Sequence, residues 1–162
     1  MARSERPDPL LPDRAAALSA GCGGFAGDPG RDGLRRQTMS VEANKQLVRE
    51  YLAFLEARDG ASAAALLADD VSWWYVDRGF LKKENIMATH AKIFSLTNAM
   101  TFTITVQIAE GDWVATETHV QYKTKDGRDL DNDVHMAMRI VDGKIREVRE
   151  FYNMGRPPLS LS

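Results

Sequence analysis

The sequence predicts an α+β domain, in which helices cover one face of a strongly curved antiparallel sheet and leave a pocket between the two layers. Two observations point to this class. Apolar residues recur at helical spacing in three segments between residues 41 and 94, whereas apolar and polar residues mostly alternate from residue 101 to residue 153. Helices followed by a run of antiparallel strands typically pack as two layers around one core.

Length and composition favour a single domain. The chain has 162 residues, of which 44% are hydrophobic, and a usual domain has roughly 100 to 150 residues. The formal net charge of −2 provides no positive field for nucleic acid or an anionic membrane. No apolar run approaches the roughly 20 residues that cross a bilayer, and the single Cys22 fits a reducing compartment. We therefore expect a cytoplasmic protein with no nucleic-acid or membrane partner.

Residues 1–38 differ in composition from the rest of the chain. They are rich in proline and glycine and carry scattered charges without a hydrophobic period. Such a segment cannot bury enough apolar surface to offset its conformational entropy, so we expect a disordered leader. The folded domain then covers residues 39–154. Residues 155–162, which contain Pro157 and Pro158, are expected to form an irregular tail.

The helical pattern begins after Ser40, whose side chain is expected to cap the helix, and continues to about residue 57. Its apolar stripe consists of Leu47, Val48, Tyr51, Leu52 and Leu55. An alanine-rich helix is expected over residues 61–68. A third helix is expected over residues 82–94, with Ile86, Met87, His90 and Ile93 on one side.

Strands are predicted where β-branched and aromatic residues predominate. Residues 71–76 form the first strand, which ends at Asp77-Arg78-Gly79. Residues 101–108 alternate strictly, with Phe102, Ile104, Val106 and Ile108 on one side. Residues 113–153 contain three further strands, joined at residues 125–127 and 141–143.

Loop length decides which side chains of these last strands share a face, because a shift of one residue turns a whole strand over. Two-residue Asp-Gly loops would place Glu150 beside His135. Three-residue loops, each a type I turn closed by a left-handed glycine, would instead group Thr118, Val120, Asn132, Val134, Met136, Val148, Glu150 and Tyr152. We favour the second arrangement, because it collects the valines and methionines on one core face.

A further three-residue loop at Glu110-Gly111-Asp112 would add the four apolar residues of strand 101–108 to the same face. Glu150 and Asn132 would then be polar groups on an otherwise apolar surface. Trp73 and Tyr75, which alternate with Trp74, are expected to contribute to the wall of the pocket.

Two stretches resemble the SnoaL-like group of the nuclear-transport-factor-two and ketosteroid-isomerase superfamily. They are NKQLVREYLAFLEARDGASAAALLADDVSWW at residues 44–74 and KDGRDLDNDVHMAMRIVDGKIREVREFYN at residues 125–153. The resemblance covers residues 41–154 and implies a cone of curved sheet closed by helices. It leaves the activity open, because the superfamily includes isomerases, epoxide hydrolases, dehydratases, polyketide cyclases and proteins without catalysis.

The resemblance also allows known catalytic residues to be compared position by position. Against the ketosteroid isomerases, Tyr51 stands at the tyrosine of the first helix, but Tyr75 stands at the aspartate base and Met136 near the third group. Against the limonene-type epoxide hydrolases, Glu150 stands at one aspartate. There Thr118 and Val120 stand at the arginine and the second aspartate. This chain therefore lacks the base of the ketosteroid isomerases and the water-activating relay of the epoxide hydrolases.

Glu150 is the strongest catalytic candidate, because desolvation disfavours a carboxylate and raises its pKa toward the range useful for acid–base catalysis. Tyr51 and Tyr75 are expected to assist it by hydrogen bonding. The expected substrate contacts are Trp73, Thr118, Val120, Asn132, Val134, Met136 and Tyr152. The alternative is that Glu150 is a structural carboxylate, bonded to a tyrosine, to Asn132 or to an arginine.

The three histidines favour no metal site. His119 and His135 are expected on the outer sheet face, and no third ligand stands at a recognisable spacing. His90 is either directed into the pocket or, as is more common, an ordinary half-buried histidine. No phosphate-binding loop is present in the sequence, and no cofactor is implied.

We therefore expect a protein that binds a small, largely apolar molecule. Either it catalyses an isomerase, cyclase or dehydratase type of reaction, or it is a non-catalytic binding or dimerisation module. A homodimer is implied by the resemblance, and the outer sheet face, with Thr103, Thr105, His119, His135 and Ala137, is mixed enough in polarity to form its contact.

Overall fold

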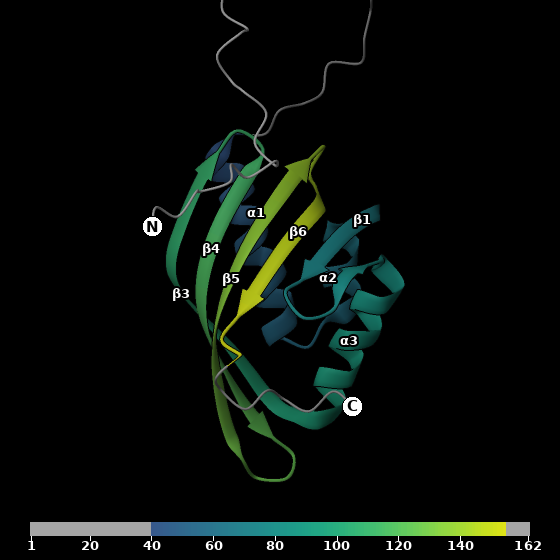
Figure 1. Ribbon diagram of the computed structural model, residues 1–162, viewed down its shortest axis with the longest axis vertical. Coiled ribbons are helices and arrows are strands. Elements are labelled where there is room, and N and C mark those ends of the chain that lie inside the picture. The colour runs from purple at the N-terminus through teal and green to yellow at the C-terminus, as the bar shows by residue number, and fades with distance from the viewer. Residues whose placement is uncertain (1–39, 155–162) are drawn as a thin grey trace, which may run out of the picture. The chain divides into compact units, whose positions relative to one another are not determined.

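The computed structural model describes residues 40–154, so the expected leader and tail lie outside the described residues. Three helices and six strands follow in this range (Figure 1). In chain order they are α1 (Val41–Glu56), α2 (Gly60–Leu66), β1 (Leu67–Tyr75), β2 (Gly79–Leu81), α3 (Lys83–Leu96), β3 (Thr97–Glu110), β4 (Trp113–Thr124), β5 (Asp129–Val141) and β6 (Lys144–Tyr152). None of the three described helices is long and apolar enough to span a membrane.

The strands form one mixed sheet in the order β2-β1-β6-β5-β4-β3. Strands β3 to β6 are the expected antiparallel meander. Strand β1 pairs in parallel with β6 and antiparallel with β2, so the expectation of a wholly antiparallel sheet is wrong at this end. Strand β2 was not predicted, because three residues are too few to show an alternating pattern.

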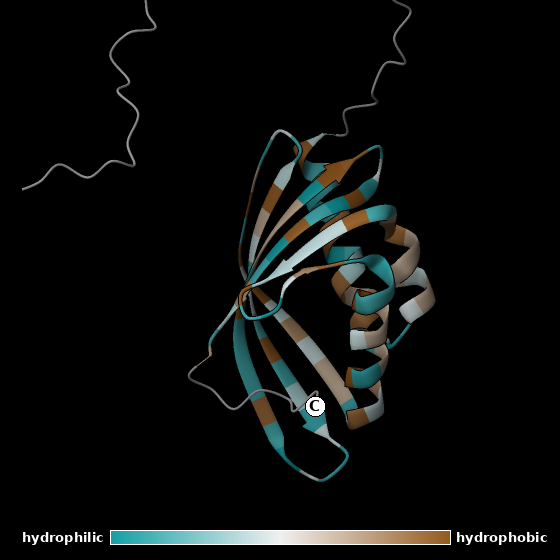
Figure 2. Ribbon diagram, turned by 45° about the vertical axis from the view of Figure 1, so that its right-hand side comes forward, coloured by the Kyte–Doolittle hydropathy of each residue, from teal (hydrophilic) through white to brown (hydrophobic). Residues whose placement is uncertain are grey.

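The helices lie on one face of the curved sheet, as Figure 2 shows. Ser40 caps α1 as expected, since its hydroxyl accepts a hydrogen bond from the backbone N–H of Ala43 at 3.1 Å. The predicted apolar stripe of α1 is buried, and Asn44 lies in line with it. Helix α2 ends earlier than predicted, because the backbone becomes extended at Leu67 and enters β1. The α+β class and the helix-covered curved sheet are confirmed.

The inner face of the meander contains the residues that the sequence predicted, although only one loop has the expected length. Between β4 and β5 the chain turns over three residues, 125–127, with Gly127 at φ +86°. Between β5 and β6 it turns over two, because Val141 pairs with Lys144, and Asp142 and Gly143 both have positive φ. The register then shifts by one residue at Arg146, so Met136 still lies opposite Glu150.

A two-residue turn and a register shift also occur between β3 and β4. Here they remove two residues from the predicted inner face. The turn has two residues, because Glu110 pairs with Trp113, and the register shifts at Thr105. Phe102 therefore lies opposite Val120 as expected. Beyond the shift the strand is turned over, so Val106 and Ile108 point outward and are 45% and 63% exposed.

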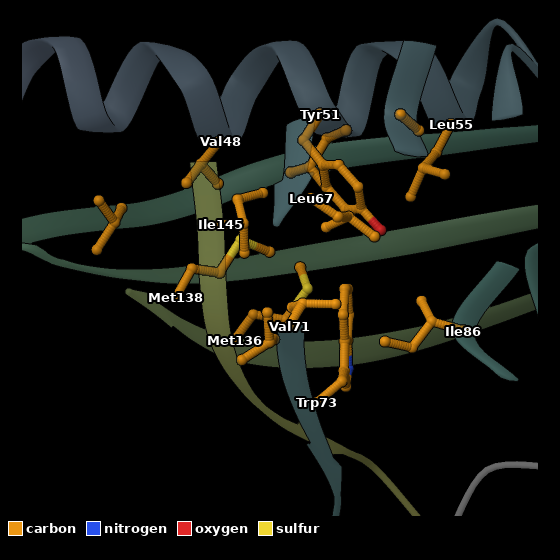
Figure 3. Close-up of a cluster of buried hydrophobic side chains, with 14 of the residues drawn as sticks. Val48, Tyr51, Leu55, Leu67, Val71, Trp73, Ile86, Met136, Met138 and Ile145 are labelled. Atoms are coloured by element: carbon orange, nitrogen blue, oxygen red, sulfur yellow. The ribbon is translucent and has the colours of Figure 1, made fainter. Parts of the chain in front are cut away.

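The core lies between α1 and the inner sheet face. Figure 3 shows Val48, Tyr51 and Leu55 extending from α1 toward the strands, where Met138 and Ile145 lie below Val48. The largest fully buried side chains are Trp73 and Tyr51. Because Trp73 comes from β1 and Tyr51 from α1, these two aromatic residues join the helical layer to the parallel end of the sheet.

Candidate functional site

A cavity of about 60 Å³ lies between the helices and the inner face of the sheet. It is mainly apolar and aromatic, and every strand except β2 contributes to it. Its lining consists of Tyr51, Leu52 and Leu55 from α1, Trp73 and Tyr75 from β1, His90, Ile93 and Phe94 from α3, Met100 and Phe102 from β3, Val120 and Tyr122 from β4, Val134 and Met136 from β5, and Glu150 from β6.

Glu150 is the acidic residue of this lining. Its position follows from the parallel pairing of β1 with β6, in which Trp73 lies opposite Val148 and Tyr75 lies opposite Glu150. The indole Nε1 of Trp73 donates a hydrogen bond to Oε2 of Glu150 at 2.9 Å. Burial raises the pKa of Glu150 to about 7, although hydrogen bonds from Trp73 and Tyr75 oppose this rise. The carboxyl group therefore gains and loses its proton near neutral pH.

His90 and Tyr51 form a second polar pair in the cavity wall. The Tyr51 hydroxyl lies 3.4 Å from Nε2 of His90, and Nδ1 of His90 has no hydrogen-bond partner among the described residues. Burial lowers the pKa of His90 to about 4, so the imidazole is neutral at physiological pH. Burial and the nearby Glu150 raise the pKa of Tyr51 well above its ordinary value, so this hydroxyl keeps its proton.

Aromatic rings connect these two polar groups. The rings of Trp73 and Tyr75 are stacked with their centroids 5.9 Å apart, and the Tyr51 ring lies 6.0 Å from that of Trp73. The His90 ring meets Trp73 edge-on at 6.1 Å. Trp73 therefore lies at the centre of this group, with its N–H on Glu150 and its ring near those of Tyr51, Tyr75 and His90.

The other two histidines lie on the outer face of the sheet, as predicted. Nδ1 of His119 lies 2.9 Å from Oδ1 of Asp133, and the ring of His135 packs near Phe151. Neither residue lines the cavity. Within residues 40–154, no group of histidine, cysteine and acidic side chains has the arrangement of a metal site.

The SnoaL-like domain model matches residues 48–148 of this chain. The chain belongs to the SnoaL-like family. The match covers the later part of α1, all of α2 and α3, and the strands as far as Val148 in β6, so it ends just before Glu150. No curated protein sequence matches the chain.

Solved structures with the same fold confirm this membership at the level of architecture. AclR, a putative hydroxylase from Streptomyces galilaeus, has a TM-score of 0.67 at 19% identity, over 74% of this chain and 89% of that one. An LEH-like epoxide hydrolase of M. tuberculosis has a TM-score of 0.64 at 17% identity, over 72% of this chain and 86% of that one. A protein with a ketosteroid isomerase-like fold from Catenulispora acidiphila, solved with trimethylamine, has a TM-score of 0.61 at 18% identity, over 68% and 88%. At these identities the likeness concerns the fold alone.

In this SnoaL-like chain the cavity brings together seven of the ten residues that the sequence suggested for the site. They are Tyr51, Trp73, Tyr75, Val120, Val134, Met136 and Glu150. The remaining three, Thr118, Asn132 and Tyr152, are not part of the cavity lining. The Thr118 hydroxyl donates to the carbonyl of Val134 at 3.3 Å, inside the sheet.

Asn132 lies beyond the end of the cavity, where it holds the end of β6. Its side-chain N–H donates to the carbonyl of Asn153 at 3.3 Å, and its side-chain oxygen accepts from the Asn153 N–H at 2.9 Å. This structural role is the alternative that a buried asparagine usually suggests.

Several lining residues of the SnoaL-like cavity were not identified from the sequence. His90 is 6% exposed and lies in the wall, so the half-buried interpretation is wrong. Tyr122 follows Val120 at the period of the strand, a signal that could have been used. Ile93 belongs to the apolar side that the sequence predicted for α3, whereas Phe94, next to it in the chain, was not placed on that side.

Proposed function

We propose that this SnoaL-like chain binds a small organic molecule in the cavity and exchanges a proton with it through Glu150. The observation that carries this proposal is the Glu150 carboxyl group in an aromatic cavity, with a pKa raised to about 7. A group whose pKa lies near the working pH is suited to both giving and taking a proton.

The surrounding groups support a single proton-exchanging residue. Trp73 holds one carboxyl oxygen of Glu150 by its N–H bond. Burial raises the pKa of Tyr51 and of Tyr75 well above the ordinary value, so both hydroxyls remain neutral hydrogen-bonding groups. One carboxyl group that removes a proton and returns it elsewhere is sufficient for a cofactor-independent isomerase, cyclase or dehydratase type of reaction.

The fold supports a small-molecule role as well. The protein of ketosteroid isomerase-like fold from Catenulispora acidiphila was solved with trimethylamine. In the present chain, the cavity of about 60 Å³ has roughly the volume of two water molecules. The ligand is therefore small, or the cavity enlarges by movement of its lining when a larger ligand enters.

A second candidate function is a non-catalytic binding module. The observation that favours it is the hydrogen bond from Trp73 to Glu150, together with the small size of the cavity. A carboxyl group that is already bonded, in a nearly filled interior, resembles a structural partner of Trp73. The two functions differ in one respect, which is whether a proton moves between Glu150 and the bound molecule.

The test is deuterium exchange into the bound molecule. Native mass spectrometry of the purified protein identifies a co-purified small molecule, which is then incubated with the protein in heavy water. We expect the wild-type protein to introduce deuterium at carbon positions of the molecule. The Glu150→Gln variant should bind the molecule without doing so. Glu117→Gln, on the outer face of β4, is the matched control. Equal exchange by the wild type and Glu150→Gln would exclude the acid–base role and leave the binding module.

A further inference from the structure

We infer that the ligand of this cavity is a small protonated amine, whose charge is held by Glu150 and whose N–H groups are shared between Glu150 and His90. This inference rests on the proposed small-molecule binding at the same cavity and names the chemical class of the ligand. Four features of the cavity support it: aromatic walls, one carboxyl group, one neutral imidazole with an unpaired nitrogen, and small size.

The aromatic walls favour a cation over a neutral ligand. An ammonium group near the face of tryptophan or tyrosine is attracted by the negative face of the ring, and tryptophan is the strongest of the aromatic side chains in this respect. Trp73 and Tyr75 stack on each other in the wall, and Tyr51 lies at an angle to them. This attraction is stronger when the cation is desolvated.

Glu150 supplies the charge that a cation requires. A buried carboxylate without a positive partner is costly, which is why burial raises the pKa of this group. A bound ammonium would remove that cost by pairing with the carboxylate. Hydrogen bonds between charged groups are also roughly twice as strong as those between neutral groups.

His90 supplies a hydrogen-bond acceptor. Its side chain is 6% exposed, lines the cavity and has no partner at Nδ1. A buried nitrogen without a hydrogen bond is unfavourable, so a ligand that donates an N–H there gains from a group that is already desolvated. We assign the ring proton to Nε2, which then donates to the Tyr51 hydroxyl oxygen and leaves the lone pair on Nδ1. An ammonium group can use that lone pair and a carbonyl group cannot.

Arg78, whose guanidinium lies 5.6 Å from the centre of the Tyr75 ring, is a cation near Glu150. The other titratable groups near Glu150 do not oppose a second cation. The tyrosines that approach it all have raised pKa values and stay neutral; they are Tyr51, Tyr75, Tyr122 and Tyr152. Asp77 and Arg78, in the turn after β1, act on Glu150 with opposite signs. His90 remains neutral above a pKa of about 4.

The size of the cavity sets the length of the amine. About 60 Å³ is roughly twice the share of volume of one water molecule in the liquid, so the probe must have few carbon atoms, and an amine of four non-hydrogen atoms requires the lining to move apart on binding. Isopropylamine, isopropyl alcohol and acetone have the same branched skeleton. They present a charged donor, a neutral donor and acceptor, and a pure acceptor, respectively.

The experiment measures the affinity of the full-length protein for these three probes by titration calorimetry at pH 6 and pH 8. Isopropylamine is fully protonated at both values, so only Glu150 changes its charge. We expect the amine to bind more tightly than either neutral probe. We also expect its affinity to rise about tenfold from pH 6 to pH 8, because a carboxyl group of pKa about 7 is mostly protonated at the first and mostly ionised at the second.

Two variants test the two contacts. Glu150→Gln should remove the pH dependence and the preference for the amine. His90→Phe keeps an aromatic ring but removes the acceptor, so it should weaken amine binding several-fold and leave the tenfold dependence on pH in place. The thermal unfolding of each variant is measured alongside, and Glu117→Gln should behave as the wild type.

The outcomes separate this inference from the proposed function. Binding of alcohol or acetone with equal or higher affinity, or an affinity that falls as pH rises, would overturn the amine and leave a small-molecule cavity. A His90→Phe variant with unchanged amine affinity would remove the imidazole from the inference. If none of the three probes binds, the amine is overturned, whereas the proposed binding role is decided separately by the co-purified molecule.

Discussion

The indole N–H of Trp73 and the carboxyl group of Glu150 are 77 positions apart in the sequence and 2.9 Å apart in the structure. They meet because β1 lies beside β6 in parallel, which sets Tyr75 opposite Glu150 and Trp73 two residues earlier on the same face. This contact moderates a carboxyl group that burial alone would keep more fully protonated.

Replacing Trp73 by phenylalanine should therefore raise the pKa of Glu150 above about 7, because the ring remains while the donor is lost. Carbon-13 detected titration of the Glu150 carboxyl group measures this shift. Trp74→Phe, on the opposite side of the same strand, is the control. A lowered or unchanged pKa in Trp73→Phe would show that the indole N–H does not stabilise the carboxylate.

Glu150 and His90 should influence stability in opposite directions as pH changes. The pKa of Glu150 is higher in the folded state, so its contribution is complete below about pH 4.5 and is lost as pH rises through about 7. The pKa of His90 is lower in the folded state, so its contribution is complete above about pH 6.5 and is lost as pH falls toward 4. Each effect is on the order of 3 kcal/mol.

Between about pH 4.5 and pH 6.5 these two slopes should largely cancel in the wild type. Relative to the wild type, Glu150→Gln should gain free energy of unfolding as pH rises through this window, and His90→Phe should lose it. Urea unfolding at several pH values measures both. Parallel curves for the wild type and Glu150→Gln would mean that Glu150 titrates normally.

Asn132→Ala should destabilise the protein without changing ligand binding. The substitution removes two hydrogen bonds to Asn153, at 3.3 and 2.9 Å, and each such bond contributes about 0.5–1.5 kcal/mol. Asn98→Ala loses only one bond of 3.5 Å and should have a much smaller effect. A loss of binding in Asn132→Ala, at unchanged stability, would restore the ligand-binding role that the sequence suggested.

A homodimer remains our expectation, with its contact on the outer sheet face. That face is more apolar than the sequence indicated, because the shift at Thr105 exposes Val106 and Ile108 near the partly exposed Trp113. Ile108→Glu should weaken association in light-scattering measurements, whereas Val41→Glu, at the start of α1, should not. A monomeric wild type at micromolar concentration would contradict this expectation.

The sequence predicted most of the site because the site lies on strands with a clear period of two. Glu150, Met136, Val134 and Val120 share a face for that reason alone. Local patterns carry no information on which strand comes to lie beside β6, so the Trp73 contact could not be derived. The same holds for His90, whose direction depends on how α3 rests against β1. Asn132 and Thr118 were predicted on the same face, but their side chains bond backbone groups and neither lines the cavity.

The two register shifts, at Thr105 and Arg146, stand between the cavity and the hairpin ends at residues 111–112 and 142–143. A two-residue turn with one extra residue in the adjoining strand places the same side chains on the inner face as a three-residue turn without the extra residue. The hairpin ends can therefore exchange one form for the other while Glu150 and Phe102 stay aimed inward. Among SnoaL-like relatives, an insertion in such a turn should be accompanied by a deletion within the following or preceding strand. An alignment that places both changes in the turn would therefore assign the cavity residues to the wrong face.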